Sequence, residues 1–309
     1  MQITPAALDA IFYTINTLFQ GAYSTTPNFW NRVAMLAPSA GRDNRYGWLR
    51  SLPAMREWIG ERVYRNLEAS SYTLVNRDFE LTLALKRNEI EDDLIGMYNS
   101  YIQMMGAQAA KWPDDLVRTV MQEGNTRLCF DGQPFFSASH PTFAPAGGTY
   151  QNWWASGLAL NSANYQTVRQ TMMSYVDEAA RPMGIIPNLL VVPPQLEATG
   201  RQILNADFTA PAAALGQNAA SIQQTNVLKG SAELLVLPEL TNQATRWYLL
   251  DNTKPVKPFV FQQRKAPTSV ALTDPQSENL FRRKEYVYGV DSRGESGYSL
   301  PFLCAAAQA

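Results

Sequence analysis

Residues 91–123 read EDDLIGMYNSYIQMMGAQAAKWPDDLVRTVMQE and are predicted to form the helix around which the other elements are arranged. Acidic residues at 91–93 suit the positive end of a helix dipole, and Gly124-Asn125 can end the helix in a left-handed cap. Pro113 should kink the helix or restart it, with Asp114 and Asp115 in the new first turn. The helical face is predicted from apolar residues that recur at a spacing of three and four: Leu94, Ile95, Met97, Tyr98, Tyr101, Ile102, Met104 and Met105.

Such a helix would hold about 30 residues and extend for about 45 Å, which exceeds the usual width of a globular domain. The length indicates a spine across which other elements lie. The alternative is a pair of ordinary amphipathic helices around a core.

An earlier helix is predicted to begin at Thr4-Pro5 and to end at Gly21. Its apolar stripe includes Phe12 and Phe19, and the stretch that follows it, up to residue 47, looks irregular. An isolated helix of this kind needs a partner surface to be stable. We interpret it as an arm; the alternative is a helix folded onto its own domain.

A β-hairpin is predicted directly before the spine, over residues 70–87. Phe79, Leu81 and Leu83 alternate with polar residues, and Asn76-Arg77-Asp78 can form the turn. No local element covers the apolar face, and a two-stranded ribbon alone is marginally stable in water. The hairpin is therefore expected to project and to pack on another subunit.

The remainder mixes helices and strands without regular alternation, which predicts the α+β class. The expected helices, strands and connections are helices at 161–180 and 194–205, strands at 189–192, 233–237, 246–250, 258–263, 284–290 and 298–304, a turn at 291–297, and a mobile loop at 206–230.

Composition excludes several classes of protein. The 309 residues are 46% hydrophobic and 17% charged, with a net charge of -1, so the chain lacks the basic excess of a general nucleic-acid or anionic-membrane binder. No basic stretch precedes an apolar one, and no apolar run approaches ~18 residues, so neither a signal peptide nor a membrane span is expected. Cys129 and Cys304 lie far apart in apolar surroundings, which predicts buried free thiols.

Residues with the spacing of a chemical site are scarce. His140 is the single histidine, and Ser137 and Ser139 are too close to it in sequence to indicate a hydrolytic triad. One histidine and two separated cysteines do not suggest a soft-metal site, and no phosphate-binding glycine motif occurs. We expect no catalytic, metal or cofactor residues, with a hydrolase that uses His140 as the remaining alternative.

The ordered set of motifs resembles the major head subunit of Mu-like phages and prophages, which has the Hong Kong 97 type capsid fold. The resemblance covers nearly the whole chain and rests on residues 55–62, 72–80 and 87–93 with Gly96 and Tyr98, then on Phe130-Asp131-Gly132, Phe135-Phe136-Ser137, His140-Pro141, residues 187–194, Trp247-Tyr248-Leu249, Arg293-Gly294 and Gly297.

This resemblance implies a structural protein of the virion that assembles in the host bacterial cytoplasm. Pentamers and hexamers of the chain would enclose double-stranded DNA without sequence-specific binding. A separate scaffold or protease, a portal and a decoration protein are the implied partners. The implied domains are an N-terminal arm at 1–47, an extended loop at 48–90, a peripheral domain at 91–159 and 252–309 that includes the spine, and an axial domain at 160–251.

Contacts between subunits would come from the arm and the extended loop. The mixed charges of the loop would set pairing and register between subunits more than affinity. The candidate residues are Arg56, Glu57, Trp58, Glu61, Arg62, Phe79, Leu81, Leu83, Phe12 and Phe19. An encapsulin-like compartment shell, which shares the fold, is the alternative from another functional class.

Overall fold

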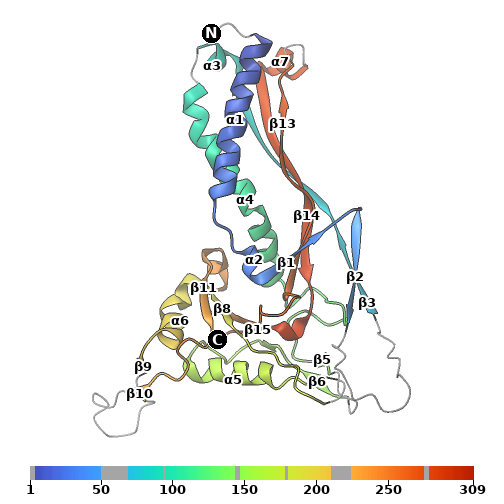
Figure 1. Cartoon of the computed structure of the whole chain (residues 1–309), viewed down its shortest axis with the longest axis vertical. Helices are drawn as coiled ribbons and strands as arrows, with labels where there is room; N and C mark the ends of the chain where they lie inside the picture. The colour runs from blue at the N-terminus through green and yellow to red at the C-terminus, as the bar shows by residue number, and fades with distance from the viewer. Residues whose placement is uncertain are drawn as a thin grey trace.

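The computed structural model describes residues 4–49, 69–92, 95–142, 147–177, 180–209, 224–274 and 278–309. Two long helices and a long sheet form a tall part, which we call the tower, and it stands on a broader part with a second sheet, which we call the base (Figure 1). Helices and strands mix without regular alternation, so the predicted α+β class is confirmed.

The first tower helix, α1, spans Pro5–Thr25. The Thr4 hydroxyl accepts a hydrogen bond from the amide of Ala7 at 3.2 Å, which confirms the predicted start. The predicted end at Gly21 is wrong, because the helix continues to Thr25. Hydroxyl groups replace a glycine cap at this end: the side chain of Thr26, for example, donates to the carbonyl of Ala22 at 2.7 Å.

The second tower helix, α4, spans Asn99–Gln122 and has 24 residues, about 36 Å of helix. It begins later than predicted, because the short helices α3 (Arg87–Glu91) and η1 (Ile95–Tyr98) precede it. Of the two outcomes predicted at Pro113, a restart is wrong, since α4 continues through this residue, and a kink stays a prediction. Pro113 is buried, and the tertiary packing of a buried helix can outweigh one missing backbone hydrogen bond.

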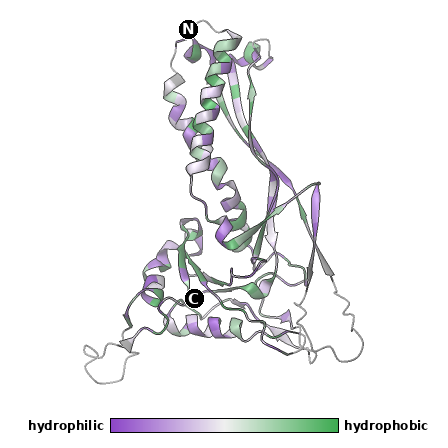
Figure 2. Cartoon of the chain, viewed as in Figure 1, coloured by the Kyte–Doolittle hydropathy of each residue, from purple (hydrophilic) through white to green (hydrophobic). Residues whose placement is uncertain are grey.

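Helix α1 lies along α4 in the same chain, which is the alternative of a helix folded onto its own domain (Figure 1). The two backbones approach closely at Gly106, where an added Cβ would lie 2.5 Å from the carbonyl oxygen of Phe19. Figure 2 shows that both helices carry hydrophobic and hydrophilic segments. The buried residues between them and the sheet form one cluster: Leu8, Ile11, Phe12, Ile15, Phe19, Leu85, Ile90, Ile102, Met105, Ala109, Leu280, Tyr286, Tyr288 and Val290.

The tower sheet has four strands in the order β1-β13-β14-β4. The predicted turn at 291–297 is wrong, because β14 runs through it and pairs with β13 on one side and β4 on the other. Gly294 permits a close approach between strands, since an added Cβ would clash with the carbonyl oxygen of Gln262. The strands are β1 (Ala34–Pro38), β13 (Phe259–Leu272), β14 (Glu285–Tyr298) and β4 (Arg77–Lys86), with helix α7 (Glu278–Arg283) between β13 and β14.

The hairpin predicted over residues 70–87 is wrong in its pairing. Strand β3 (Ala69–Val75) pairs with β2 (Asp43–Leu49), whereas β4 pairs with β14. A single residue, Asn76, separates β3 from β4, and its side chain bonds to Ser39 and to the carbonyl of Gly41. This anchoring directs the two strands into different sheets, which alternation of apolar residues could not reveal.

The base sheet has five strands in the order β11-β8-β12-β15-β7. Strands β8, β12 and β15 are buried at every position, and alternate residues along them enter two different clusters. Burial on both faces explains their continuous apolar sequence. The strands are β11 (Glu233–Val236), β8 (Leu189–Val192), β12 (Trp247–Leu250), β15 (Cys304–Ala307) and β7 (Trp153–Trp154).

Helices flank this sheet, and the predicted elements of residues 189–250 are confirmed with small shifts at their ends. The helix predicted over 161–180 ends earlier, at Met173. In the loop predicted at 206–230 the structure describes two short paired strands, and residues 210–223 lie outside the described residues. These and the remaining short elements are α5 (Ser162–Met173), η2 (Pro194–Leu196), α6 (Glu197–Leu204), α2 (Trp30–Val33), β5 (His140–Pro141), β6 (Thr149–Tyr150), β9 (Phe208–Thr209), β10 (Gln224–Thr225), η3 (Pro238–Gln243) and η4 (Pro301–Leu303).

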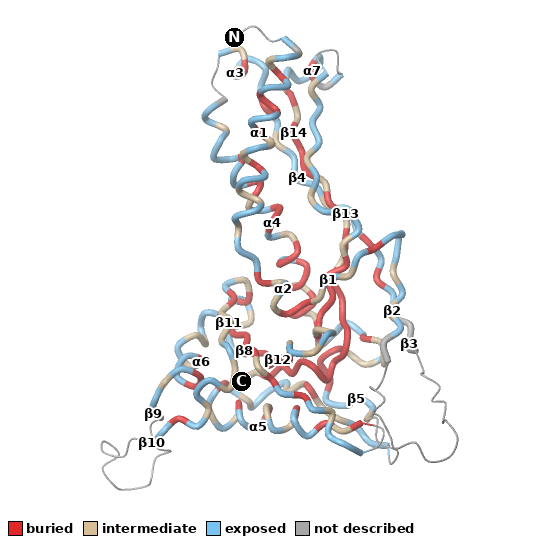
Figure 3. The backbone as a smooth tube through the Cα atoms, in the orientation of Figure 1, coloured by how far each residue is buried: buried red, intermediate tan, exposed pale blue. Residues whose placement is uncertain are grey.

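One buried cluster joins the tower to the base. Val117 of α4, Phe259 of β13 and Tyr298 of β14 pack with residues of β8, β12 and β15. Figure 3 shows buried backbone concentrated where the two parts meet. The shared core fixes the tower on the base, so the tower can serve as a rigid support for any segment attached to it.

Candidate assembly surfaces and a buried polar cluster

The β2–β3 hairpin projects from the side of the tower (Figure 1). Buried amide side chains hold the end of the hairpin that is attached to the tower. Gln262 of β13 donates from Nε2 to Oδ1 of Asn76 at 2.7 Å and to the carbonyl of Leu74 at 3.2 Å. The hydroxyl of Tyr46 donates to Oε1 of Gln262 at 2.8 Å, and Asn76 donates to Oγ of Ser39 at 2.8 Å. A buried polar group left without a partner costs roughly 1–3 kcal/mol, so this network fixes the direction of the hairpin.

Close apolar contact adds to this anchor. Leu74 packs on Gly297 of β14, where an added Cβ would lie 2.5 Å from a Leu74 methyl group and 2.9 Å from the Tyr72 hydroxyl. The rings of Tyr72 and Tyr298 are 6.5 Å apart. Burial raises the pKa of Tyr72 to about 12, which keeps its hydroxyl neutral at ordinary pH. The lack of a side chain at Gly297 therefore allows the hairpin to pack against β14.

Five of the predicted contact residues lie between β2 and β3 in the sequence, within 50–68, and thus outside the described residues. The two strand ends that flank this segment are paired, Leu49 with Ala69. The segment therefore begins and ends at the far end of the hairpin. These five residues are Arg56, Glu57, Trp58, Glu61 and Arg62.

The other five predicted contact residues belong to the tower. Phe12 and Phe19 of α1 are 9% and 0% exposed, and they pack within this chain. On β4, Leu83 packs against the same cluster, and Phe79 lies 5.4 Å from Trp112 between ring centroids. Leu81 is 39% exposed and is the most accessible of these five in the single chain.

An apolar strip on η1 and the start of α4 is exposed, and it was not predicted as a surface from the sequence. The sequence places Met97, Tyr101 and Met104 on one face with Ile102 and Met105. In the structure the first three are 58%, 61% and 62% exposed, whereas Ile102 and Met105 are buried. The predicted apolar face is therefore too broad, and only part of it meets α1 and the tower sheet.

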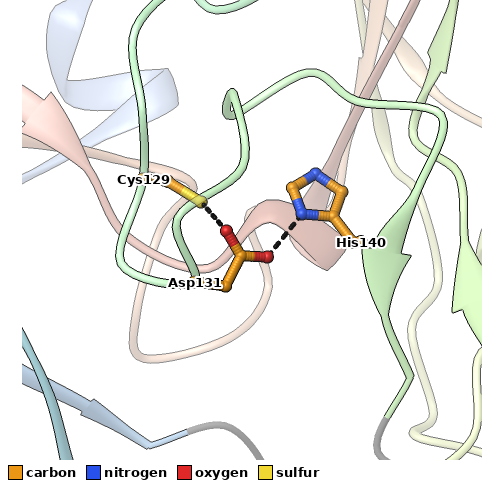
Figure 4. A group of neighbouring side chains, drawn as sticks. All are labelled: Cys129, Asp131 and His140. Carbon is orange, nitrogen blue, oxygen red and sulfur yellow. Dashed lines mark hydrogen bonds and ion pairs between the residues drawn. The ribbon is translucent and has the colours of Figure 1, made fainter. Parts of the chain in front are cut away.

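A polar cluster is buried in the loop between α4 and β5, where Cys129, Asp131 and His140 converge (Figure 4). Nδ1 of His140 lies 2.6 Å from Oδ2 of Asp131, and Nε2 lies 3.1 Å from the carbonyl oxygen of Phe135. The Cys129 thiol donates to Oδ1 of Asp131 at 2.9 Å. His140 is fully buried and stacks on Tyr150, with 5.1 Å between ring centroids.

The environment of this cluster shifts two of its groups. Burial raises the pKa of Asp131, but hydrogen bonds from His140, from the Cys129 thiol and from the Gln133 amide outweigh it, so the pKa lies below its ordinary value. Burial and the hydrogen bond to Asp131 raise the pKa of the Cys129 thiol. A carboxylate that stays ionised thus accepts from a thiol that stays protonated.

Two interpretations made from the sequence concern this cluster: the alternative of a hydrolase that uses His140, and the argument against a soft-metal site. His140 lies in the core, and both ring nitrogens already face acceptors, so neither is free to serve as the base of a hydrolytic triad. The sequence argument against a soft-metal site considered histidine and cysteine only. The structure adds the Asp131 carboxylate as a third donor, and the three ligand atoms lie within 4.8 Å of one another. The Asp131-Gly132 turn was the available signal.

A buried asparagine holds the same loop in place and was not foreseen. Nδ2 of Asn152 donates to the carbonyls of Phe135, Pro301 and Cys304 at 2.8, 3.0 and 3.1 Å. Its Oδ1 accepts from the amide of Ser137 at 2.9 Å. Four backbone groups thus depend on one side chain. The predicted burial of both cysteines as free thiols is confirmed.

Among the described residues, no helix combines the length and the apolar character needed to cross a membrane.

Several solved structures with this arrangement are capsid structures. The procapsid of bacteriophage JBD30 matches with a TM-score of 0.62 and 29% identity, over 99% of this chain and 76% of that chain. The JBD30 capsid decorated with minor capsid protein trimers matches with a TM-score of 0.58 and 27% identity, over 72% and 94%. The virus-like particle from Pyrococcus furiosus, at 10% identity, shares the fold, with a TM-score of 0.55 over 96% and 99%. The class of protein is therefore a capsid protein with the Hong Kong 97 type fold.

Sequence relatives identify the family. The chain belongs to the Mu-like prophage major head subunit gpT family, whose model matches residues 8–152, 145–240 and 239–309. The major capsid protein of Escherichia phage Mu is 28% identical over 298 residues, which cover 96% of this chain and 72% of the phage protein. The Mu-like prophage FluMu major head subunit of Haemophilus influenzae (strain ATCC 51907 / DSM 11121 / KW20 / Rd) is 26% identical over 296 residues, which cover 96% and 71%.

The protein is thus a major capsid protein of the Mu-like type, which assembles with copies of itself into the shell of a virion. The resemblance, the fold class and the function predicted from the sequence are confirmed. The alternative of an encapsulin-like compartment is not favoured, because the sequence relatives are phage head proteins.

Proposed function

We propose that this capsid protein forms pentamers and hexamers of an icosahedral shell around double-stranded DNA. The near-neutral net charge of -1 suits a wall that confines DNA without sequence-specific contacts. A scaffold or protease and a portal would assist assembly. The JBD30 capsid carries minor capsid protein trimers, which supports a decoration protein as a further partner.

The domains of the proposed subunit follow the predicted order with adjusted limits. The arm (1–47) and the extended loop (48–90) would each give one strand to the tower sheet, because β1 and β4 pair with β13 and β14. Most of the tower would belong to the peripheral domain (91–159 and 252–309). Most of the base would belong to the axial domain (160–251), but β7 and β15, which fall within the peripheral limits, pair in the base sheet.

The projecting part of the extended loop would consist of β3 and residues 50–68, and β3 pairs with β2, most of which lies in the arm (1–47). The observation that carries this proposal is the buried attachment of the hairpin to β13 and β14 through Gln262, Asn76 and Leu74. A projection with a rigid base can present its far end to a neighbouring subunit with little loss of conformational entropy on binding. The mixed charges of residues 56–62 would then set register between subunits.

Replacing residues 50–68 by Asn-Gly tests this proposal. Leu49 and Ala69 are paired, so a two-residue turn can close the hairpin without disturbing it. We expect a chain that unfolds at the wild-type denaturant midpoint but forms no closed shells in electron micrographs. A deletion of 62–86 would test it less well, because it removes β4, whose Leu85 is buried in the tower.

A second variant separates the side chains of the loop from its length. It keeps all residues of 50–68 except that Arg56, Glu57, Trp58, Glu61 and Arg62 become Ser. We expect few or misformed shells from this variant as well. Normal shells from both variants would contradict the proposed role of the loop.

We propose no catalytic role for this protein. Support comes from the burial of His140 and from the engagement of both of its ring nitrogens. His140→Ala should therefore change stability and assembly, and no hydrolytic activity should accompany the wild-type chain.

A further inference from the structure

The cluster of Cys129, Asp131 and His140 gathers three metal-ligand side chains in the core of the chain. A thiol, a carboxylate and an imidazole are the donor groups that zinc binds in proteins. All three come from one short segment. The backbone of that segment forms a tight turn. The backbone amide of Cys129 donates to the carbonyl of Gln133 at 2.8 Å, and Gly132 has a φ of +81°.

Both ring nitrogens of His140 face oxygen atoms. Nδ1 lies 2.6 Å from Oδ2 of Asp131 and Nε2 lies 3.1 Å from the carbonyl oxygen of Phe135, whereas a neutral imidazole has only one N–H to donate. A metal ion bound between Nδ1 and the Asp131 carboxylate would give both of these groups a partner, while Nε2–H donates to the Phe135 carbonyl.

That remaining hydrogen bond is the support a metal-binding histidine normally has. Histidine ligands almost always donate their other N–H to a carbonyl or carboxylate, which fixes the tautomer and the ring orientation. Here the acceptor is the carbonyl of Phe135, which Asn152 also holds at 2.8 Å. Tyr150 stacks on the ring and restricts its rotation further.

We propose that Sγ of Cys129, the carboxylate of Asp131 and Nδ1 of His140 bind one thiophilic divalent metal ion, with zinc as the closest match. On binding, the thiol releases its proton to solvent, and the neutral imidazole binds through the lone pair of Nδ1. The thiolate and the carboxylate then balance the two positive charges of the ion, so the loaded site has a net charge of zero.

The geometry needs only small movements. Zinc lies roughly 2.0–2.3 Å from nitrogen, oxygen and sulfur ligands, which places tetrahedral ligand atoms roughly 3.2–3.7 Å apart. The present distances of 2.6 Å and 2.9 Å to the Asp131 oxygens are those of hydrogen bonds, and all the ligand atoms lie within 4.8 Å. Binding one ion between these atoms would open the two contacts by roughly 0.3–1.1 Å. A water molecule would complete the coordination.

The test is the metal content of the full-length chain. The protein is expressed in zinc-supplemented medium, purified without chelator and assayed by mass spectrometry of the elements. We expect about one zinc per chain. After removal of metal, titration with cobalt(II) should produce a thiolate-to-cobalt charge-transfer band, and zinc chloride should raise the unfolding temperature by several degrees.

Matched variants identify the ligands. Cys129→Ser keeps the size of the side chain but removes the soft ligand, so it should lose zinc and the cobalt band. Cys304→Ser alters the other buried cysteine, which lies outside the cluster, and should retain both signals. Wild-type protein with far less than one zinc per chain and no cobalt band would overturn the proposal and leave a hydrogen-bonded histidine–carboxylate pair. Equal zinc in wild type and Cys129→Ser would also overturn it.

Discussion

The carboxylate of Asp114 accepts a hydrogen bond from the backbone amide of Trp30 at 2.8 Å, and this contact ties the middle of α4 to the start of α2. The same oxygen accepts from the amide of Phe29 at 3.0 Å. Asp114 is 4% exposed and follows Pro113. The residue expected to begin a new helix after the proline instead caps a different helix from outside.

Asp114 should make stability depend on pH. Burial raises its pKa from 3.8 to about 6, against the opposing hydrogen bonds from Trp30 and Phe29. Between these values the folded chain holds a proton that the unfolded chain has released, so the free energy of unfolding falls as pH rises from about 4 to about 6. The fall attributable to Asp114 is at most about 3 kcal/mol.

Asp114→Asn should remove this slope, because the amide does not titrate and its oxygen can still accept from both backbone amides. Denaturant unfolding of the unassembled chains from pH 4 to pH 7 measures the difference. Asp114→Ala serves as the comparison, and it should lose about 1–2 kcal/mol even at pH 4, since two buried amides lose their acceptor. Parallel pH curves for wild type and Asp114→Asn would show that this carboxyl does not titrate in the range.

Gly106 should tolerate no side chain, because α1 and α4 meet there. A Cβ would lie 2.5 Å from the Phe19 carbonyl oxygen and 3.0 Å from the Ala22 Cβ. Gly106→Ala should therefore lower the free energy of unfolding by about 1–3 kcal/mol, despite the better helix propensity of alanine. Chemical denaturation measures the change.

Gly21→Ala is the matched control on α1. No atom lies within 4 Å of the added Cβ, so helix propensity alone should act and the chain should gain up to about 1 kcal/mol. Two variants with the same effect would mean that the helices can separate locally at no cost.

Substitutions of Met104 and Met105 should separate an effect on assembly from an effect on stability, because these neighbouring residues differ in exposure. Met105 is 6% exposed and Met104 is 62% exposed. Met105→Ser should lower the free energy of unfolding by about 2–5 kcal/mol, through a lost apolar contact in the tower. Met104→Ser should change it by less than about 0.5 kcal/mol but should lower the yield of shells, if the exposed strip of α4 contacts neighbouring subunits.

The yield is measured by sedimentation of assembled particles at equal protein concentration. A normal yield from Met104→Ser would remove the α4 strip from the proposed assembly surfaces. It would leave the proposal for residues 50–68 unchanged, because these residues are tested by separate variants.

Local patterns predicted several elements of the base correctly, but the hairpin that they predicted over residues 70–87 is wrong in its pairing. The apolar run at Leu189–Val192 identifies a strand, because four consecutive buried residues reflect a sheet covered on both faces. The alternation at Phe79–Lys86 also identifies a strand, but strand partners are set by contacts distant in sequence. Asn76 redirects the chain through bonds to Ser39 and Gly41, and no local signal marks those bonds.

The candidate site was also indicated only in part by the sequence. The resemblance drew attention to Phe130-Asp131-Gly132 and His140-Pro141, but it gave no reason for their association. The structure supplies the reason, which is the pairing of Asp131 with His140 at 2.6 Å. Gln262 and Asn152 could not be predicted, because a polar residue in an apolar stretch shows its role only through the partners it meets.

Periodicity and motif order are properties of the chain, and they predict the spine helix, three strands of the base (β8, β11 and β12), the α+β class and the family. Contacts between distant residues set the start of α4 at Asn99, the place of Pro113 inside it and the contact of Asp114 with Trp30. These features arise because burial compensates local costs. A proline in a helix and a carboxylate in a core are both unfavourable alone, and their neighbours in space make them stable.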